Sequence, residues 1–132
     1  MEGRERDVLY YKTVRGVCPF KEWRDRISDD DTRAAVDARI ARFRGGNFGD
    51  SGPIGDGASE NRIHSDPGHR IYYGVDGDSV VLLWAGDADI IRARDYWKDY
   101  KKRESERKTV EREKEALKNV GLQKRSFRRP KK

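Results

Sequence analysis

The chain has 132 residues, of which 41% are charged and 34% hydrophobic, and 30 Lys and Arg against 24 Asp and Glu give a formal net charge of +6. This is enough for one domain with a thin core. Cys18 is the one cysteine, which excludes an intrachain disulfide and a multi-cysteine zinc site. There is no signal-peptide pattern and no apolar run of the roughly 18 residues that cross a bilayer, so we expect a cytoplasmic protein without a membrane partner.

The charge is unevenly distributed along the chain. Residues 1–91 hold 13 Lys and Arg against 17 Asp and Glu, a net charge of −4. Residues 92–132 hold 17 against 7, a net charge of +10. The basic character therefore belongs to the last third of the chain.

The N-terminal part predicts one strand and two helices. The β-branched and aromatic run 8–14 favours a strand. Pro19 can begin a short helix, and Asp29-Asp30-Asp31 can cap a second one that ends at Gly45-Gly46. Apolar residues recur on one face of each helix: Phe20, Trp23 and Ile27 in the first, and Val36, Ile40 and Phe43 in the second.

The middle of the chain predicts a loop and then a three-stranded antiparallel meander. Residues 47–59 are so rich in Gly and Asp that we expect a surface loop. Strands are expected at 60–65, 69–75 and 79–85, because short turn sequences separate them. Alternation then places Ile63, Ile71, Tyr73 and Val75 on an apolar face, and Arg62, His64, Arg70 and Tyr72 on the opposite face.

A helical pattern follows Gly86-Asp87, with one stripe that can pack on the sheet: Ile90, Ala93, Trp97 and Tyr100. Beyond Lys101 the pattern is polar nearly all round, with many Glu/Lys/Arg pairs four residues apart, so this part can stay helical but has little to bury. Residues 119–132 are expected to form a flexible basic tail.

The polar face of the meander carries the residues suited to chemistry. Arg62 and Arg70 would bring two guanidinium forks together, which suits a phosphodiester, and Tyr72 or His64 could move protons during attack by an internal 2′-hydroxyl group. That reaction needs no metal. The same alternation is also compatible with two arginines that merely lie on the solvent side of a half-exposed sheet.

Other candidate sites have weaker signals. His64 and His69 lie five residues apart across a Pro-Gly turn, without the partners of a usual metal site. The glycines of residues 45–57 lack the spacing of a phosphate-binding loop, and Cys18 is typical of a buried or capping cysteine. No cofactor is expected.

An ordered series of motifs extends over residues 8–100. It consists of Pro19-Phe20-Lys21-Glu22-Trp23, RGGNFGD at 44–50, GDG at 55–57, SENRIH at 59–64, PGHRIYY at 67–73 and LLWAGD at 82–87. The series resembles the phage-derived addiction module killer branch of the RelE/ParE toxin superfamily, close to the HigB toxins.

The resemblance implies a fold and a function. The fold would be α+β in the order β-α-α-β-β-β-α, with a toxin domain at 1–103 and a charged helical extension and basic tail at 104–132. The function would be that of a type II toxin, a metal-independent endoribonuclease that cleaves mRNA on the ribosome. Its partner would be a cognate antitoxin, usually a helix-turn-helix protein. The alternative is a non-catalytic or gyrase-targeting binding protein of the same fold.

The resemblance also implies roles for single residues. Arg62 and Arg70 match the arginines that hold the scissile phosphate, and Tyr72 matches an aromatic position beside them. His69 stands where tyrosine is frequent, and Asp87 keeps a Gly-Asp pair. The lysine that usually follows is Ala88 here, so its contribution to substrate binding would fall to Arg92 or Arg94.

Overall fold

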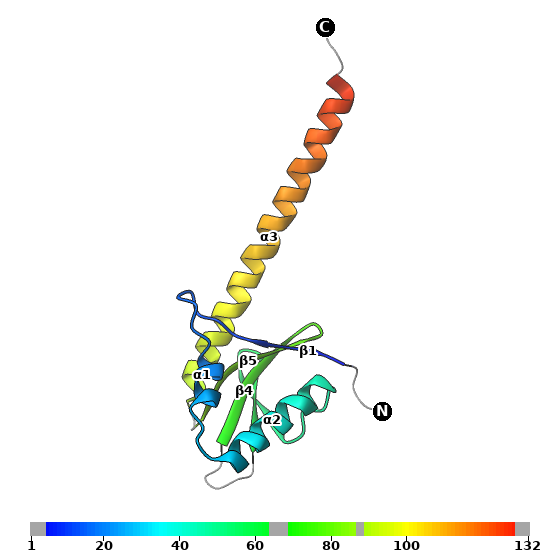
Figure 1. Ribbon diagram of the computed structural model, residues 1–132. Helices are drawn as coiled ribbons and strands as arrows, with labels where there is room; N and C mark the ends of the chain where they lie inside the picture. The colour runs from blue at the N-terminus through cyan, green and yellow to red at the C-terminus, as the bar shows by residue number, and fades with distance from the viewer. Residues whose placement is uncertain (1–4, 64–68, 87–88, 129–132) are drawn as a thin grey trace. The chain divides into compact units, whose positions relative to one another are not determined.

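The computed structural model describes residues 5–63, 69–86 and 89–128, in the element order β-α-α-β-β-β-β-α (Figure 1). The strands are β1 (Asp7–Tyr10), β2 (Ser51–Gly55), β3 (Ala58–Ile63), β4 (His69–Asp76) and β5 (Ser79–Gly86). The helices are α1 (Pro19–Asp25), α2 (Asp30–Arg44) and α3 (Ile90–Arg128). The α+β class is confirmed, with one strand more than predicted.

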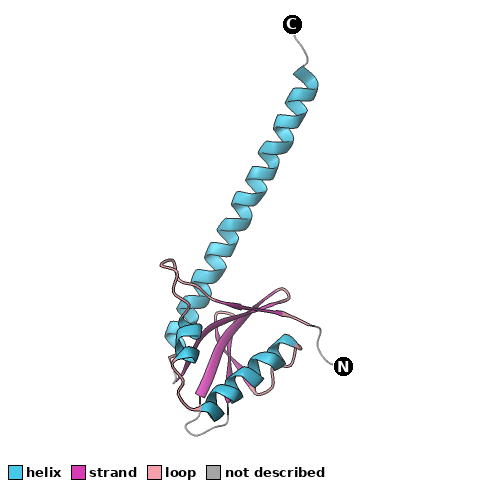
Figure 2. Cartoon of the chain, viewed as in Figure 1, coloured by secondary structure: helices cyan, strands magenta, loops and turns pink. Residues whose placement is uncertain are grey.

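The strands form one mostly antiparallel sheet in the order β1-β5-β4-β3-β2 (Figure 2). β1 runs parallel to β5, and the other neighbouring strands are antiparallel. The predicted meander is confirmed as β3, β4 and β5. Its last two strands are not in uniform register, because Tyr72 pairs with Trp84 whereas Tyr73 pairs with Leu82, which leaves Leu83 as the extra residue of a bulge.

β2 shows that the loop predicted for residues 47–59 is wrong in its second half. Ser51–Gly55 pairs with β3 although it contains two glycines and Pro53. The strand lies at the edge of the sheet, so one of its sides has no neighbouring strand. Proline is tolerated in edge strands because the N–H group that it lacks is not needed on that side. An edge position therefore tolerates a sequence that a central strand would not.

Helices α1 and α2 cover one face of the sheet and enclose the hydrophobic core. Asp29 caps α2 as predicted, because its side chain accepts a hydrogen bond of 2.9 Å from the Thr32 backbone N–H. The core combines side chains of both helices with alternate strand residues: Phe20, Val36, Ile40, Phe43, Ile63, Ile71, Tyr73, Val80, Leu82 and Ala85. Val75 was expected among them but is 41% exposed, because it lies beside the turn that ends the β4–β5 hairpin.

The opposite face is covered by the start of α3. Ala93 and Trp97 are buried, which confirms that this part of the predicted stripe packs on the sheet. The indole of Trp97 lies directly on Gly74 of β4, where a Cβ atom would come within 2.5 Å of the ring. Glycine is therefore required at this position by close packing.

Two further boundaries differ from the prediction. β1 ends at Tyr10 rather than Val14, because the chain turns at residues 13–16, where the Gly16 backbone N–H donates to the Thr13 carbonyl. The flexible tail expected from residue 119 is wrong as far as Arg128, since α3 continues to that residue. Leu122, Gln123, Lys124 and Arg125 have high helix propensity, which favours that continuation despite Gly121. Residues 129–132 lie outside the described part.

By compactness the chain divides into two units, Met1–Lys98 and Asp99–Lys132. In the second unit, ion pairs one turn apart support the helix, among them Arg103–Asp99 at 2.7 Å and Arg107–Glu104 at 3.0 Å. Residues 105–120 are exposed. None of the helices described has a segment both long and apolar enough to span a membrane.

Candidate functional site

Arg62 and Arg70 lie directly opposite each other on β3 and β4, on the face of the sheet that α3 covers. The next pair on this face, one pleat further, is Glu60 and Tyr72. The structure therefore brings three predicted site residues together, as the alternation indicates. The two arginine side chains are 42% and 39% exposed, so their guanidinium groups are accessible from solvent.

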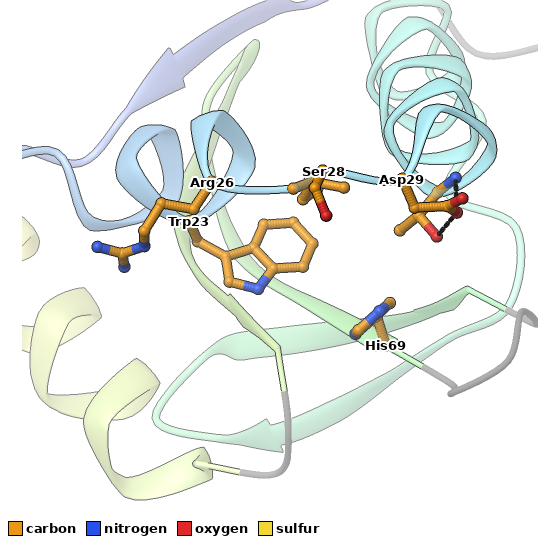
Figure 3. A pocket seen from close by; sticks show the side chains of 7 residues that line it. Trp23, Arg26, Ser28, Asp29 and His69 are labelled. Carbon is orange, nitrogen blue, oxygen red and sulfur yellow. Dashed lines mark hydrogen bonds between the residues drawn. The ribbon is translucent and has the colours of Figure 1, made fainter.

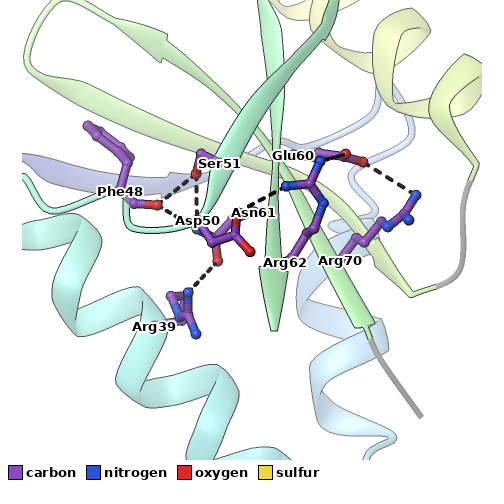
Figure 4. A network of polar contacts seen from close by, with 8 residues as sticks. All are labelled: Arg39, Phe48, Asp50, Ser51, Glu60, Asn61, Arg62 and Arg70. Carbon is purple, nitrogen blue, oxygen red and sulfur yellow. Dashed lines mark hydrogen bonds and ion pairs between the residues drawn. The ribbon is translucent and has the colours of Figure 1, made fainter. Parts of the chain in front are cut away.

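Glu60 lies between the two arginines (Figure 4). One carboxylate oxygen accepts a hydrogen bond of 3.0 Å from Arg62 Nη2, and the other is 3.5 Å from Arg70 Nη1. Arg62 Nη1 donates to Asp50 at 3.0 Å. Two cations and two carboxylates thus share the surface, and their formal charges cancel. Sequence reasoning missed Glu60, although alternation places a residue two positions before Arg62 on the same face.

Asp50 is held in place by a buried polar network on the other side of β3. The Asn61 side chain is fully buried and donates to the Phe48 carbonyl at 2.5 Å and to Ser51 Oγ at 3.0 Å. Its oxygen accepts from Arg39 of α2 at 3.1 Å (Figure 4). The Arg62 backbone N–H also donates to the Asp50 carbonyl at 2.9 Å. The carboxylate that pairs with Arg62 therefore sits on a fixed loop.

Tyr72 is fully buried, unlike the arginines. Burial raises the pKa of its hydroxyl group, and hydrogen bonds from the Arg70 side chain and the Asp89 backbone oppose that shift. The hydroxyl group thus connects Arg70 with the residue that precedes α3. This position suits a residue that orients Arg70.

His69 lies on the opposite face of the sheet from Arg70, facing α1. Its imidazole meets the Trp23 indole edge to face, with ring centroids 5.6 Å apart (Figure 3). Both rings line a pocket of about 490 Å³ that extends to the residues between α1 and α2. His69 is therefore not part of the arginine cluster.

A second pocket, also of about 490 Å³, lies where β4 begins and β5 ends. It shares Trp23 and His69 with the first pocket, and its other lining residues are Trp84, Ala85, Gly86, Asp89 and Arg92. The Arg92 guanidinium lies 4.6 Å from the centre of the Trp84 ring, and its Nε is 3.2 Å from the Asp89 carboxylate. Arg92, a predicted site residue, therefore lines this pocket. Trp23 and Trp84 line it too, although the sequence analysis did not identify them as site residues.

Arg94 lies elsewhere. Its Nη1 donates to the Ile54 carbonyl at 3.2 Å, and its Nε is 3.8 Å from the Asp56 carboxylate. Ile54 lies near the end of β2 and Asp56 in the β2–β3 turn, at the opposite end of β3 from Arg62. Of the two arginines expected to replace the lysine, only Arg92 lines the pocket at the β4–β5 end of the sheet.

Two predicted site residues, His64 and Asp87, lie outside the described part of the chain. Within 5–63, 69–86 and 89–128, no group of three or more His, Cys, Asp or Glu side chains is placed to hold a metal ion.

Comparison with known proteins finds a related sequence. Over 75 residues the chain is 35% identical to an uncharacterized protein of Haemophilus influenzae. The aligned region covers 56% of this chain and 76% of the relative. No protein-family model matches the chain.

Proposed function

The chain belongs to the family of this Haemophilus influenzae protein, and we propose that it is a type II toxin that cleaves messenger RNA without a metal. In this proposal the fold is RelE-like and a cognate antitoxin holds the toxin inactive. The ribosome presents the substrate in cells, whereas the chain itself carries every group of the cleavage step and also cleaves bare RNA. The relative's name gives no activity. The proposal therefore depends on the motif series and on the cluster around Arg62.

The observation that supports RNA cleavage best is the paired, accessible guanidinium groups of Arg62 and Arg70 with a carboxylate between them. Arginine binds the two non-bridging oxygens of a phosphodiester with parallel hydrogen bonds. It also stabilises the charge that develops on a pentacoordinate phosphorus. A phosphate group that enters here would exchange some of the arginine contacts to Glu60 for contacts to its own oxygens.

The cleavage step requires a proton acceptor, and we assign that role to Glu60. The 2′-oxygen attacks the adjacent phosphorus atom while its proton passes to the Glu60 carboxylate. The bond from phosphorus to the 5′-oxygen breaks, and the departing oxygen takes a proton from solvent. The products are a 2′,3′-cyclic phosphate and a 5′-hydroxyl end. Tyr72 orients Arg70 and does not touch the substrate in this scheme.

One observation favours the alternative, a non-catalytic or gyrase-targeting member of the same fold. Glu60 and Asp50 already neutralise the charges of both arginines, so the cluster has no formal excess of positive charge for an RNA phosphate. A protein surface could bind such a mixed-charge patch.

The test uses purified full-length protein and a bare RNA substrate in excess EDTA. We expect cleavage to continue, with 5′-hydroxyl ends and cyclic or 3′-phosphate ends, because the scheme uses only cations and a proton acceptor of the chain. Cleavage that requires added magnesium or zinc would contradict the mechanism. Intact RNA combined with inhibition of gyrase supercoiling would support the alternative.

A further inference from the structure

The pocket at the β4–β5 end of the sheet has the composition of a site for a planar aromatic ligand. Its volume of about 490 Å³ falls within the range of small-molecule sites in proteins. Two indole rings, one imidazole and one guanidinium group line it, from α1, β4, β5 and α3. None of these side chains belongs to the Arg62 cluster.

The rings come from opposite faces of the sheet, which meet where β4 begins and β5 ends. Trp23 and His69 form an edge-to-face pair on one face, and Arg92 over Trp84 lies on the other. Gly86 at the end of β5 has a φ of +123°, and a Cβ atom there would be in ordinary contact with Trp23 Nε1 at 3.4 Å. The backbone conformation, rather than the space around it, therefore favours glycine at this position.

The pocket also offers polar atoms that could read the edge of a ligand. His69 lines the pocket with its ring, since its Nδ1 is buried, without a hydrogen-bond partner in the described part of the chain, and is not exposed to a ligand. The Asp89 carboxylate lines the pocket beside Arg92, and both can bond to amino or carbonyl groups. Stacking surfaces with a few donors and acceptors are the usual means of binding an unpaired base.

The pocket is connected to the arginine cluster through the sheet. Gly86 is the cross-strand partner of Arg70, so the lining of the pocket begins one strand away from the proposed phosphate site. Tyr72 contacts both the Arg70 side chain and the Asp89 backbone. The proposed phosphate site and the pocket are therefore neighbours along the sheet.

We propose that this pocket binds one unpaired base of single-stranded RNA next to the phosphate at Arg62 and Arg70. The proposal rests on the proposed function for its substrate, and it adds a subsite that positions the RNA. The base would lie against the Arg92 guanidinium that covers Trp84, with its edge toward Asp89.

The test measures binding of full-length protein to a short 2′-O-methyl RNA, which cannot be cleaved because it lacks the attacking hydroxyl group. Each position of the RNA is replaced in turn by an abasic nucleotide. We expect removal of the base at one position to raise Kd about 5- to 150-fold, the effect of losing one stacked base. An equal Kd for every abasic RNA would overturn the proposal.

Matched variants locate the effect. Trp84→Leu should weaken binding of the intact RNA and abolish the rise in Kd that removal of the bound base causes. Trp84→Phe keeps an aromatic ring and should retain most of that rise. Arg92→Gln tests the pocket if Trp84→Leu does not fold, and exposed Arg42→Ala controls for lost charge. An unchanged abasic penalty in Trp84→Leu or Arg92→Gln would place the base elsewhere and contradict the proposal.

Two outcomes separate this proposal from the proposed function. Base-dependent binding without cleavage of an ordinary RNA would retain the subsite and overturn the nuclease. Cleavage without base-dependent binding would retain the nuclease and overturn the subsite. Nucleoside monophosphates that bind as tightly as the oligonucleotide would show a site for free nucleotides and overturn the assignment to RNA.

Discussion

Glu60 determines how the two arginines beside it can act. Its side chain is 10% exposed, and each of its two oxygens faces a different guanidinium group. A carboxylate in this position can accept the proton of an attacking hydroxyl group. It can equally occupy the place that a phosphate would take. The two roles predict opposite effects of neutralising the residue.

We expect Glu60→Gln to reduce RNA cleavage about 100-fold or more, because the amide keeps the size of the side chain but accepts no proton. RNA affinity should stay equal or increase, since a negative charge is lost. Cleavage rate and Kd are measured on the same RNA, with exposed Glu113→Gln as the control. Faster cleavage by Glu60→Gln would identify Glu60 as a competitor of the phosphate.

A second residue with a testable charge effect is Asp29. Hydrogen bonds from the Thr32 side chain and backbone hold the pKa of its carboxyl group below the ordinary value of 3.8. A depressed carboxyl pKa stabilises the folded state above the unfolded value, and this stabilisation is lost as the pH falls through the lower folded value.

Asp29→Ala should therefore lower Tm at pH 7 by a few degrees, and the difference from the parent should shrink as the pH falls below about 4. Asp29→Asn keeps a hydrogen-bond acceptor without a titratable group. This variant should retain the helix, but its stability should lack the pH-dependent contribution of the Asp29 carboxyl group. Thermal unfolding from pH 7 to pH 2 measures both effects. A constant Tm difference over that range would contradict the assigned role.

At the scale of elements, the contact between β4 and α3 is close enough for a single substitution to probe it. A Cβ atom at Gly74 would lie 2.5–2.6 Å from three carbon atoms of the Trp97 ring. Since that ring is buried, it can move only by displacing its neighbours.

We expect Gly74→Ala to destabilise the fold by about 1–3 kcal/mol through overpacking. Gly52→Ala in β2 is the matched control, because a Cβ atom there meets only ordinary contact at 3.8 Å. Denaturant unfolding measures both variants. Equal stability of Gly74→Ala and the parent would show that α3 does not press on β4 at this point.

The elements also show what the sequence can predict. The bounds of α2 follow from local signals, namely a capping aspartate, apolar residues at helical spacing and terminal glycines. The shared face of Arg62 and Arg70 follows from alternation. β2 could not be predicted, because its pairing depends on β3 rather than on its own sequence. The pairing of Arg92 with Trp84 depends on the bulge at Leu83 and on the start of α3, which local patterns do not encode.

At the scale of the whole molecule, charge separates the two compact units. Residues 1–98 hold 16 Lys and Arg against 18 Asp and Glu, a net charge of −2, and residues 99–132 hold 14 against 6, a net charge of +8. A positively charged helix attracts a polyanion over a distance set by the salt concentration. The second unit can thus supply the electrostatic attraction that the first unit lacks.

A chain that ends at Arg103 should keep the sheet and the Arg62 cluster, because both lie within the first unit. Its affinity for RNA or ribosomes should fall, and the dependence of Kd on salt should become shallower. Circular dichroism and binding over a salt series measure the two expectations. Unchanged binding, or a shortened chain that does not fold, would contradict this role of residues 104–132.

The most direct test of the central claim is the mapping of 5′-hydroxyl ends of mRNA in cells after induced expression. The parent chain should create new 5′-hydroxyl ends, and Arg62→Ala/Arg70→Ala should create none, because each arginine is expected to contribute about 100-fold or more to the rate. The control Arg42→Ala/Arg44→Ala removes the same charge from exposed positions of α2 and should behave like the parent. New ends that are equally abundant with the Arg62/Arg70 variant, or no new ends with the parent, would contradict the account.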